Sequence, residues 1–303
     1  MPGQLTLLDS PSLWYRAFHG VPDSVTAPDG TPVNAVRGFL DLVARVVRDT
    51  RPARLVATLD LDWRPAFRVA AVPSYKLHRT LEGGAEAEPP ALGPQVQVVL
   101  EVLAALGVCV VGAPGHEADD VIGTLATRET GAVDVVSGDR DMLQLVRDDG
   151  PVRVLYAAEK MRPYGVAEVA AKYAVPGTAY AEYAVLRGDP SDGLPGVKGV
   201  GDKTAAALVT RFGTVEGILA AVDAGVQDGF PAGARAKVEA ARDYLAVAPA
   251  VTRVVRDLPL GELDDALPRS PRDPGRLLEL SDRWGLTSPL ERFLQALEVA
   301  HSR

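Results

Sequence analysis

Short apolar segments alternate with longer segments of helical periodicity along the first half of the chain. Residues 5–8 and 55–59 are apolar runs that are each followed by an aspartate, and residues 108–111 and 133–136 are similar runs with acidic clusters close behind them. Between these runs apolar residues recur at helical spacing, as in the segment that follows Pro94. Strands that alternate with helices predict an α/β fold with a central, mostly parallel sheet flanked by helices. In such sheets functional groups collect at the carboxyl ends of the strands, which is where these acids fall.

Two segments interrupt this alternation. Residues 64–94 begin with Arg-Pro and end in a stretch rich in Glu, Gly and Pro, so we expect a mobile lid or gateway there. Residues 193–201 are glycine-rich and predict a tight hairpin that leads into a helix, and short Ala-rich helices follow from residue 214. We therefore expect an α/β core at residues 1–185, with the gateway inserted at about 64–94, and a helical second region at residues 186–303.

Nine carboxylates stand in short clusters near the predicted strand ends: Asp9, Asp60, Glu117, Asp119, Asp120, Asp139, Asp141, Asp189 and Asp192. A fold that gathers so many like charges must neutralise them with cations, and oxygen ligands favour two divalent ions, Mg²⁺ or Mn²⁺. Two such ions about 4 Å apart can bind one scissile phosphate, one activating water and the other stabilising the departing oxygen. The joint pattern predicts a metal-dependent phosphodiesterase.

Each cluster has an ordinary interpretation when it is taken alone. Glu117 to Asp120 could be a charged first helical turn, Asp139 and Asp141 a surface turn, and Asp189 to Asp192 a simple loop. If a helix begins at Glu117, then Glu117 and Asp120 share a face, and two of the three acids can point into the site together. The four histidines lack zinc spacing, and no base accompanies the serines near Asp9.

Composition bounds the remaining possibilities. The 303 residues are 47% hydrophobic, enough for a sizeable core, and the single cysteine, Cys109, lies in an apolar run that predicts a buried structural thiol. The start carries no secretory signal and no segment approaches a membrane span, so we expect a soluble cytoplasmic protein without a membrane partner. A net charge of −8 argues mildly against nucleic acid, although bound cations would reverse the sign of the acidic site.

Five motifs follow one another from Asp9 to Ala205. They are Leu7-Leu8-Asp9-Ser10 with Tyr15-Arg16; Asp60 with Phe67-Arg68, Tyr75-Lys76 and Arg79; Gly115-His116-Glu117-Ala118-Asp119-Asp120; Ser137-Gly138-Asp139-Arg140-Asp141 with Gln144-Leu145; and Gly188-Asp189-Pro190-Ser191-Asp192 followed by residues 194–205. In this order they resemble the flap endonuclease superfamily, and most closely the 5′-nuclease domain at the front of bacterial DNA polymerase I. The resemblance implies a PIN-like sheet, a helical gateway and a helix-hairpin-helix.

The resemblance also implies roles for individual residues. The nine carboxylates would ligate two metal ions directly or through water, and Lys76 and Arg79 would contact the scissile phosphate from the base of the gateway. Arg16 and Arg140 would add phosphate contacts. The residues that would contact DNA are Phe67, Arg68, Tyr75, Gly196, Lys198, Gly199, Val200, Gly201, Lys203 and Thr204. A monovalent ion such as K⁺ would be held by the carbonyls of Leu186, Arg187, Pro195, Val197 and Val200.

Three features depart from the family pattern. Gly193 stands where the family usually has Asn, which removes a side chain that could tie down the loop beside Asp192. Asp62 competes with Asp60 for the ligand role, and we choose Asp60 because it directly follows the apolar strand. The gateway is short and its tip is acidic, so it would guide a single-stranded flap less firmly. No polymerase region follows, which predicts a stand-alone nuclease.

The implied function is a structure-specific 5′-3′ exonuclease and 5′-flap endonuclease, a monomer that acts in primer and flap removal and in repair. Its substrates would be DNA with 5′ flaps, nicks or free 5′ ends, including RNA-primed ends. Two alternatives are a PIN-like ribonuclease, which usually lacks the glycine hairpin, and a non-catalytic helix-hairpin-helix DNA-binding protein, which would have lost carboxylates. A small-molecule phosphatase is disfavoured because no Asp-x-Asp pattern follows the first strand.

Overall fold

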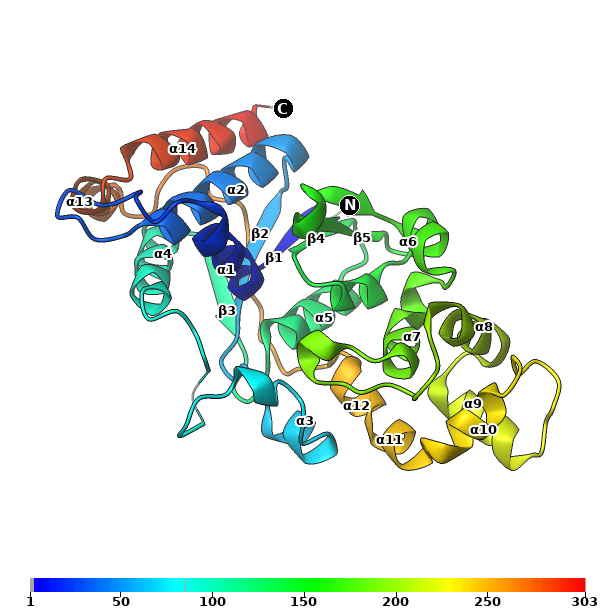
Figure 1. Cartoon of the computed structure of the whole chain (residues 1–303). Helices are drawn as coiled ribbons and strands as arrows, with labels where there is room; N and C mark the ends of the chain where they lie inside the picture. Colours follow the sequence, from blue (N-terminus) through cyan, green and yellow to red (C-terminus); the bar gives the residue numbers. More distant parts are fainter. Residues whose placement is uncertain (1–2, 85, 303) are drawn as a thin grey trace.

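A six-stranded sheet forms the centre of the molecule in the computed structural model, which describes residues 3–84 and 86–302 (Figure 1). The strand order is β3-β2-β1-β4-β5-β6. The strands are β1 (Leu5–Asp9), β2 (Arg54–Leu59), β3 (Cys109–Gly112), β4 (Val133–Ser137), β5 (Val152–Tyr156) and β6 (Arg162–Tyr164). All neighbouring pairs are parallel except β5 and β6. The mostly parallel sheet predicted from the sequence is confirmed.

Helices cover both faces of the sheet because β1 and β4 bury side chains on both sides. Leu8 packs into one apolar cluster with residues of α1, α2, α4, α13 and α14, while Leu7 packs into another with residues of α5 and α7. The helices around the sheet are α1 (Ser10–Gly20), α2 (Asn34–Thr50), α4 (Leu92–Leu106), α5 (Ala118–Arg128), α6 (Val166–Tyr173), α13 (Pro274–Trp284) and α14 (Thr287–His301). Cys109, expected to be buried, is half-buried, because it lies on the edge strand β3.

Residues 64–94 contain two short helical pieces, α3 (Ala66–Ala71) and the 3₁₀ helix η1 (Leu77–Arg79), before α4 begins. Beyond η1 the chain turns back on itself, because Thr80 pairs with Glu86 and the Ala87 N–H donates to the Arg79 carbonyl at 2.7 Å. Further 3₁₀ turns are η2 (Asp141–Leu145), η3 (Ala157–Glu159), η4 (Gly177–Ala179) and η5 (Pro190–Asp192).

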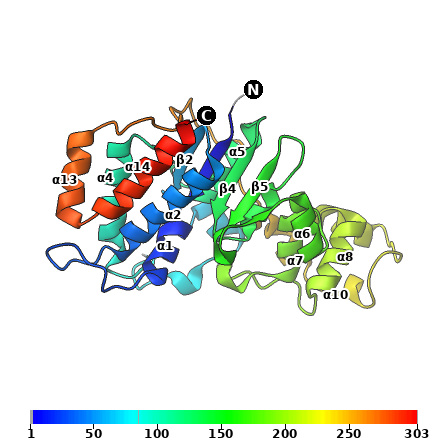
Figure 2. The same cartoon turned by 90° about the horizontal axis from the view of Figure 1, so that it is seen from above.

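A helical second region extends from one side of the sheet (Figure 2). Its helices are α7 (Tyr180–Arg187), α8 (Asp202–Phe212), α9 (Val215–Asp223), α10 (Ala234–Ala240), α11 (Arg242–Val247) and α12 (Pro249–Thr252). Among the described residues, no single helix has both the length and the apolar composition to cross a bilayer; α8 and α9, which meet at 77°, satisfy both only as a pair.

The chain then returns to the first unit. The Val254 N–H donates to the Gln144 side chain at 3.0 Å, and the Leu55 N–H donates to the Asp265 carbonyl at 2.9 Å. After this return α13 packs on α4 and α14 packs along α2, so the N- and C-terminal parts of the chain lie side by side (Figures 1 and 2). The boundary near residue 185 therefore remains a proposal for where the second region begins. The last two helices, α13 and α14, pack against the first unit rather than against the second region.

Candidate active site

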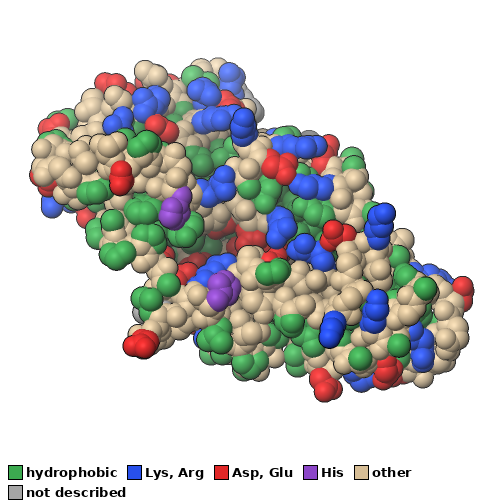
Figure 3. Space-filling model, in the orientation of Figure 1, with side chains coloured by type: hydrophobic (Ala, Val, Ile, Leu, Met, Phe, Trp, Pro, Cys, Tyr) green, Lys and Arg blue, Asp and Glu red, His purple; other side chains and the backbone are tan. Residues whose placement is uncertain are grey.

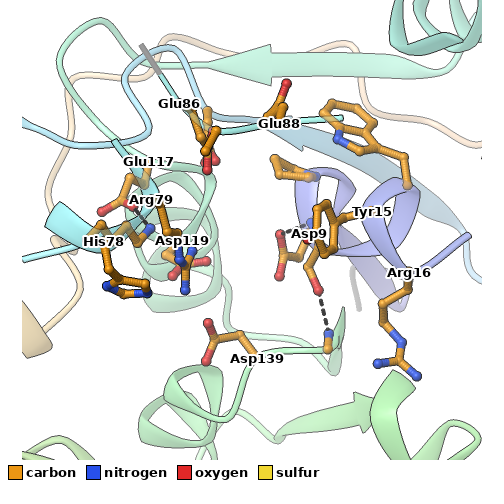
Figure 4. Close-up of a pocket in the computed structure, with 17 residues that line it drawn as sticks. Asp9, Tyr15, Arg16, His78, Arg79, Glu86, Glu88, Glu117, Asp119 and Asp139 are labelled. Carbon is orange, nitrogen blue, oxygen red and sulfur yellow. Dashed lines mark hydrogen bonds and ion pairs between the residues drawn. The ribbon is translucent and has the colours of Figure 1, made fainter. Parts of the chain in front are cut away.

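An acidic cavity of about 530 Å³ opens at the carboxyl ends of β1, β2 and β4. Its carboxylates come from Asp9, Asp60, Glu86, Glu88, Glu117, Asp119 and Asp139, and its cations from Arg16, Lys76 and Arg79. Figure 3 shows acidic side chains at the bottom of a hollow between the two parts of the molecule, with Lys and Arg side chains along its border. In Figure 4 Asp9, Asp119 and Asp139 converge on the same space from three different elements.

Asp9 ends β1 and is held in place by the turn that follows β4. Its carboxylate accepts hydrogen bonds from the Ser137 hydroxyl and, at 3.3 Å, from the Ser12 N–H. The Ser12 hydroxyl in turn accepts from the Gly138 N–H at 2.9 Å, which ties the two strand ends together. Burial, together with repulsion from the nearby carboxylates of Asp60 and Asp139, raises the pKa of Asp9 to about 7.

Asp60 follows β2 and lies beside the start of α5. Its carboxylate accepts from the Ala118 N–H at 2.6 Å, and burial raises its pKa to about 6. Asp62, the competing candidate, does not line the cavity and accepts instead from the Arg64 N–H. Burial, followed by repulsion from Asp9 and Asp139, raises the pKa of Asp119 well above its ordinary value. These shifts mean that the side chains favour a bound cation at this edge.

Glu117 and Asp120, by contrast, are already paired with cations from the gateway segment. Glu117 accepts from Arg68, from Lys76 and, at 2.8 Å, from the Tyr75 hydroxyl. Asp120 accepts from Arg68 at 2.6 Å and from the Val255 N–H at 2.9 Å. Asp120 shares a face with Glu117 as predicted, because both accept from Arg68, but it does not line the cavity. The two acids of this turn that line the cavity are Glu117 and Asp119.

Arg68 and Tyr75, which were predicted to contact DNA, are both buried in this structure. Arg68 is 2% exposed and Tyr75 is 4% exposed, and the polar groups of both side chains form hydrogen bonds inside the protein. Besides its two carboxylate partners, Arg68 donates to the Val251 carbonyl at 3.1 Å, which joins the gateway segment to the second region. Phe67 is 38% exposed and packs near His116, so its surface remains accessible.

Asp141, Asp189 and Asp192 lie behind the acidic cavity and do not line it. Burial, then repulsion from Asp139, raises the pKa of Asp141 well above its ordinary value, and its Oδ1 is buried without a hydrogen-bond partner among the described residues. Asp189 accepts from Arg140 at 3.2 Å, and Asp192 accepts from Arg79 at 3.3 Å. The buried, unpaired Asp141 oxygen has the chemistry expected of a group that awaits a cation.

The described residues contain no group of three or more His, Cys, Asp or Glu side chains already arranged around a single metal position. The donor set nevertheless suits divalent cations, because it offers hard carboxylate oxygens that are buried and mutually repelling. Ligation of a metal would therefore require side chains to move together, most simply Asp9, Asp119 and Asp139.

The loop after η5 explains why glycine replaces the usual Asn at position 193. Gly193 has φ +72°, and a Cβ there would overlap the Ser74 carbonyl oxygen. The loop is fixed to the gateway segment by bonds from the Ser74 hydroxyl to the Gly193 carbonyl at 2.8 Å and from the Lys76 N–H to the Asp192 carbonyl at 3.0 Å. The close backbone contact holds Asp192 without the missing side chain.

The predicted helix-hairpin-helix consists of α7, a glycine-rich loop and α8. Gly188 and Gly196 both have positive φ, and their backbones are so close that a side chain on either would collide with the other. Lys198, Gly199, Gly201 and Lys203 are exposed at the loop and the start of α8. Thr204 is half-buried and Val200 is buried, so only the backbone of Val200 could face a phosphate.

The structure adds cavity residues that sequence reasoning did not single out: Tyr15, His78, Glu86 and Glu88. Tyr15 is 49% exposed at the mouth of the cavity, one position before Arg16. Its position directly before Arg16 in the first motif was the available signal. Glu86 and Glu88 carried no such signal, because they reach the cavity only through the backward turn of residues 80–88.

Solved structures with this fold include the D15 protein of bacteriophage T5 co-crystallized with metal ions and the catalytic core of Rad2 in complex with a DNA substrate. The T5 protein has a TM-score of 0.63 at 18% identity and covers 98% of this chain and all of its own. The Rad2 core has a TM-score of 0.61 at 16% identity and covers 98% of this chain and 92% of its own. At these identities the likeness establishes the fold alone.

Sequence comparison establishes the family. The chain matches the 5′-3′ exonuclease N-terminal resolvase-like domain over residues 4–174 and the 5′-3′ exonuclease C-terminal SAM fold over residues 175–274. A 5′-3′ exonuclease of Streptomyces coelicolor is 54% identical over 96% of this chain and 99% of its own length. DNA polymerase I of Mycobacterium tuberculosis is 38% identical over 98% of this chain but only 32% of its own length. The chain belongs to the 5′-3′ exonuclease family, and the predicted resemblance is confirmed.

Proposed function

We propose that this protein is a structure-specific nuclease that hydrolyses DNA phosphodiester bonds at 5′ ends and 5′ flaps with the help of divalent metal ions. The observation that carries the proposal is the set of buried and half-buried carboxylates at the sheet edge that have no ion pair among the described residues, bordered by Lys76 and Arg79. Acids in that state favour hard cations, and cations together with Lys and Arg favour a phosphate. The family and the DNA-bound structural neighbours support the choice of DNA.

The metal ions would be held by Asp9, Asp60, Asp119, Asp139 and Asp141, with Glu117, Asp189 and Asp192 adding ligands directly or through water. Bound there, Mg²⁺ or Mn²⁺ would lower the pKa of a water molecule and stabilise charge on the phosphate oxygens. Asp120 is better described as a positioning residue, because its contacts to Arg68 and Val255 fix the start of α5.

The basic side chains would bind and orient the substrate. Lys76 and Arg79 each hold a carboxylate in the metal-free protein, so both can exchange that partner for a phosphate oxygen once cations neutralise the acids. Arg16 is exposed at the mouth and is free to contact a phosphate farther along the strand. The acidic residues Glu86 and Glu88 would disfavour a second phosphate on the gateway side.

The helix-hairpin-helix would bind the duplex away from the cut. The exposed N–H groups near Gly199 and Gly201, with Lys198 and Lys203, suit a phosphate ahead of a helix start. A monovalent ion such as K⁺ would use the carbonyls of Leu186, Arg187, Pro195, Val197 and Val200. The Leu186 carbonyl already accepts from the Val197 N–H at 2.9 Å, so it would contribute its second lone pair.

The test uses labelled flap, nicked and blunt DNA incubated with Mg²⁺, Mn²⁺ or chelator, beside an Asp141→Ala variant. We expect cutting near the flap junction with either metal and almost none with chelator or with the variant. Cutting that survives chelation, or an equally active variant, would refute the metal mechanism. Nicked and RNA-primed duplexes in the same assay define the substrate range, and sedimentation of the active sample tests whether it is a monomer.

A further inference from the structure

A second cavity, of about 570 Å³, lies between the end of β5, the end of α6, the second half of α7 and the start of α8. We call it the tyrosine pocket, because Tyr156, Tyr173 and Tyr183 line it. Helices α6, α7 and α8 lie next to one another in both views of the fold (Figures 1 and 2). The pocket shares no lining residue with the acidic cavity.

Five of the eight tyrosines in the chain pack together at this place: Tyr156, Tyr164, Tyr173, Tyr180 and Tyr183. Tyr164, Tyr180 and Tyr183 are 1–2% exposed and form the support. Tyr156 and Tyr173 are only half-buried, so part of each ring faces the pocket. Rings fixed from behind and open in front are suited to stacking against a flat partner.

The charge of the pocket is positive on balance. Arg140, Lys172, Arg187 and Lys203 line it, against the two acids Glu159 and Asp202. Arg140 and Arg187 also lie 3.2 Å and 3.8 Å from Asp189, which does not line the pocket. Glu159 is already neutralised by Lys172 at 2.5 Å, and Asp202 accepts the Tyr183 hydroxyl at 2.7 Å. Lys172 also lies 5.0 Å, 5.5 Å and 5.9 Å from the ring centres of Tyr164, Tyr173 and Tyr156. Aromatic faces interleaved with cations are the arrangement that binds single nucleotides of a strand.

The two cavities are joined by one turn of the chain. Asp139 lines the acidic cavity, whereas its neighbour Arg140 lines the tyrosine pocket. On the far side of the pocket, Lys203 lies in the first turn of α8, after the glycine-rich hairpin. A strand that runs from the acidic cavity to the hairpin therefore passes the tyrosine pocket.

We propose that the tyrosine pocket holds one nucleotide of the bound DNA strand, with its base against Tyr156 and Tyr173 and its phosphate on Arg140 and Lys203. The proposal rests on the proposed function, because it needs DNA at the acidic cavity. It goes further in assigning a base-stacking subsite between the site of cutting and the hairpin. Because every base has a flat face, the subsite would act on any sequence and favour a nucleotide that is not paired in a duplex.

The first experiment needs no variant. The full-length protein is titrated, in chelator to prevent cutting, with a fluorescent 5′-flap duplex in which single abasic residues replace bases at successive positions around the junction. One position should weaken binding about tenfold, since a stacked base contributes about 1.4 kcal/mol. Equal affinity for every abasic position would overturn the proposal.

The second experiment locates the effect in the protein. The double variant Tyr156→Leu, Tyr173→Leu should bind the intact flap about as weakly as the wild-type protein binds the flap whose abasic residue weakens binding most. The variant should also bind these two DNAs with equal affinity. The matched pair Tyr156→Phe with Tyr173→Phe keeps both rings and should bind like wild type. A Leu pair that still distinguishes the two DNAs would overturn the proposal.

Parallel cutting of the intact flap by wild-type protein in Mg²⁺ separates this proposal from the proposed function. Cutting without any abasic effect would reject the tyrosine pocket alone. An abasic effect without cutting would leave a DNA-binding pocket and reject the nuclease. Circular dichroism and thermal melting of both variant pairs identify a folding defect, and in that case the abasic titration of the wild type decides the outcome.

Discussion

The two flanks of the acidic cavity neutralise their charges in different ways. On the gateway flank, Glu117 and Asp120 receive built-in cations from Arg68 and Lys76. On the opposite flank, Asp9, Asp119 and Asp139 have no ion pair within the residues that the structure describes, and burial raises the pKa of Asp9 and Asp119. The first flank is complete without a ligand, whereas the second is not. Internal pairing therefore distinguishes acids whose charge is already balanced within the protein from acids that still need a cation.

The largest expected effect compares two adjacent acids of α5. Asp119→Asn should lower the rate of DNA cutting more than about 100-fold, because it removes an oxygen from the unpaired flank. In chelator its free energy of unfolding should stay equal or rise, since a buried unpaired charge disappears. Asp120→Asn should instead lower the free energy of unfolding by about 1–3 kcal/mol by weakening the bond to Arg68.

Cutting rates and urea denaturation of the two variants provide the measurements. Mg²⁺ should raise the melting temperature of wild type and of Asp120→Asn, and should do so much less for Asp119→Asn. If both variants lost cutting equally and neither changed in stability, the distinction between the two flanks would not hold.

The next effect concerns Arg68, the cation that pairs with the acids of the gateway flank. Arg68→Met should lower the free energy of unfolding in chelator by about 3–5 kcal/mol, because Glu117 and Asp120 are left buried without a partner. Added Mg²⁺ should restore part of the loss by supplying a replacement cation. Arg276→Met is the matched control, since Arg276 pairs with Glu101 and Glu279 at the exposed surface and should have little effect. Equal losses in the two variants would contradict the comparison.

The smallest effect concerns the acids that reach the cavity from the gateway. Glu86→Gln with Glu88→Gln should tighten DNA binding about two- to fivefold at pH 8, since two negative charges near the phosphate path are removed. Burial, then repulsion from Glu88, raises the pKa of Glu86 to about 7, so Glu86 is mostly protonated at pH 6 and ionised at pH 8. The gain should therefore shrink at pH 6. A gain that is independent of pH would assign the effect to Glu88 alone.

Local sequence was sufficient for the first four strands and for the acids that directly follow β1 and β2, whereas β5 and β6 were not predicted. Asp9 and Asp60 each come after an apolar strand of a parallel sheet, so the periodicity of the chain alone places them at the same edge. The family resemblance supplied the order of the motifs, and the matching family models confirm it. The choice of Asp60 over Asp62 followed from the same strand argument and agrees with the cavity.

The structure differs from the sequence-based expectations where the orientation of a side chain depends on contacts that are distant in sequence. Whether Arg68 faces DNA or the interior is decided by Glu117, Asp120 and the Val251 carbonyl, none of which is near it in the chain. The orientation of Asp120 depends in the same way on Val255. The tyrosine cluster was visible as a local excess of Tyr, but its contact with Arg140 and Lys203 appears only when the sheet and the second region are assembled.

The packing of α14 along α2 has a consequence for synthesis of the protein. While the chain emerges from the ribosome, α2 and the strands beneath it exist long before their outer covering, because Thr287–His301 comes far later in the chain than α2. Until then an apolar face of the nascent core stays open to water and to other chains. The core thus stays incomplete until α14 has been made, so deleting α14 should lower the solubility of the protein during its production rather than only remove a peripheral element.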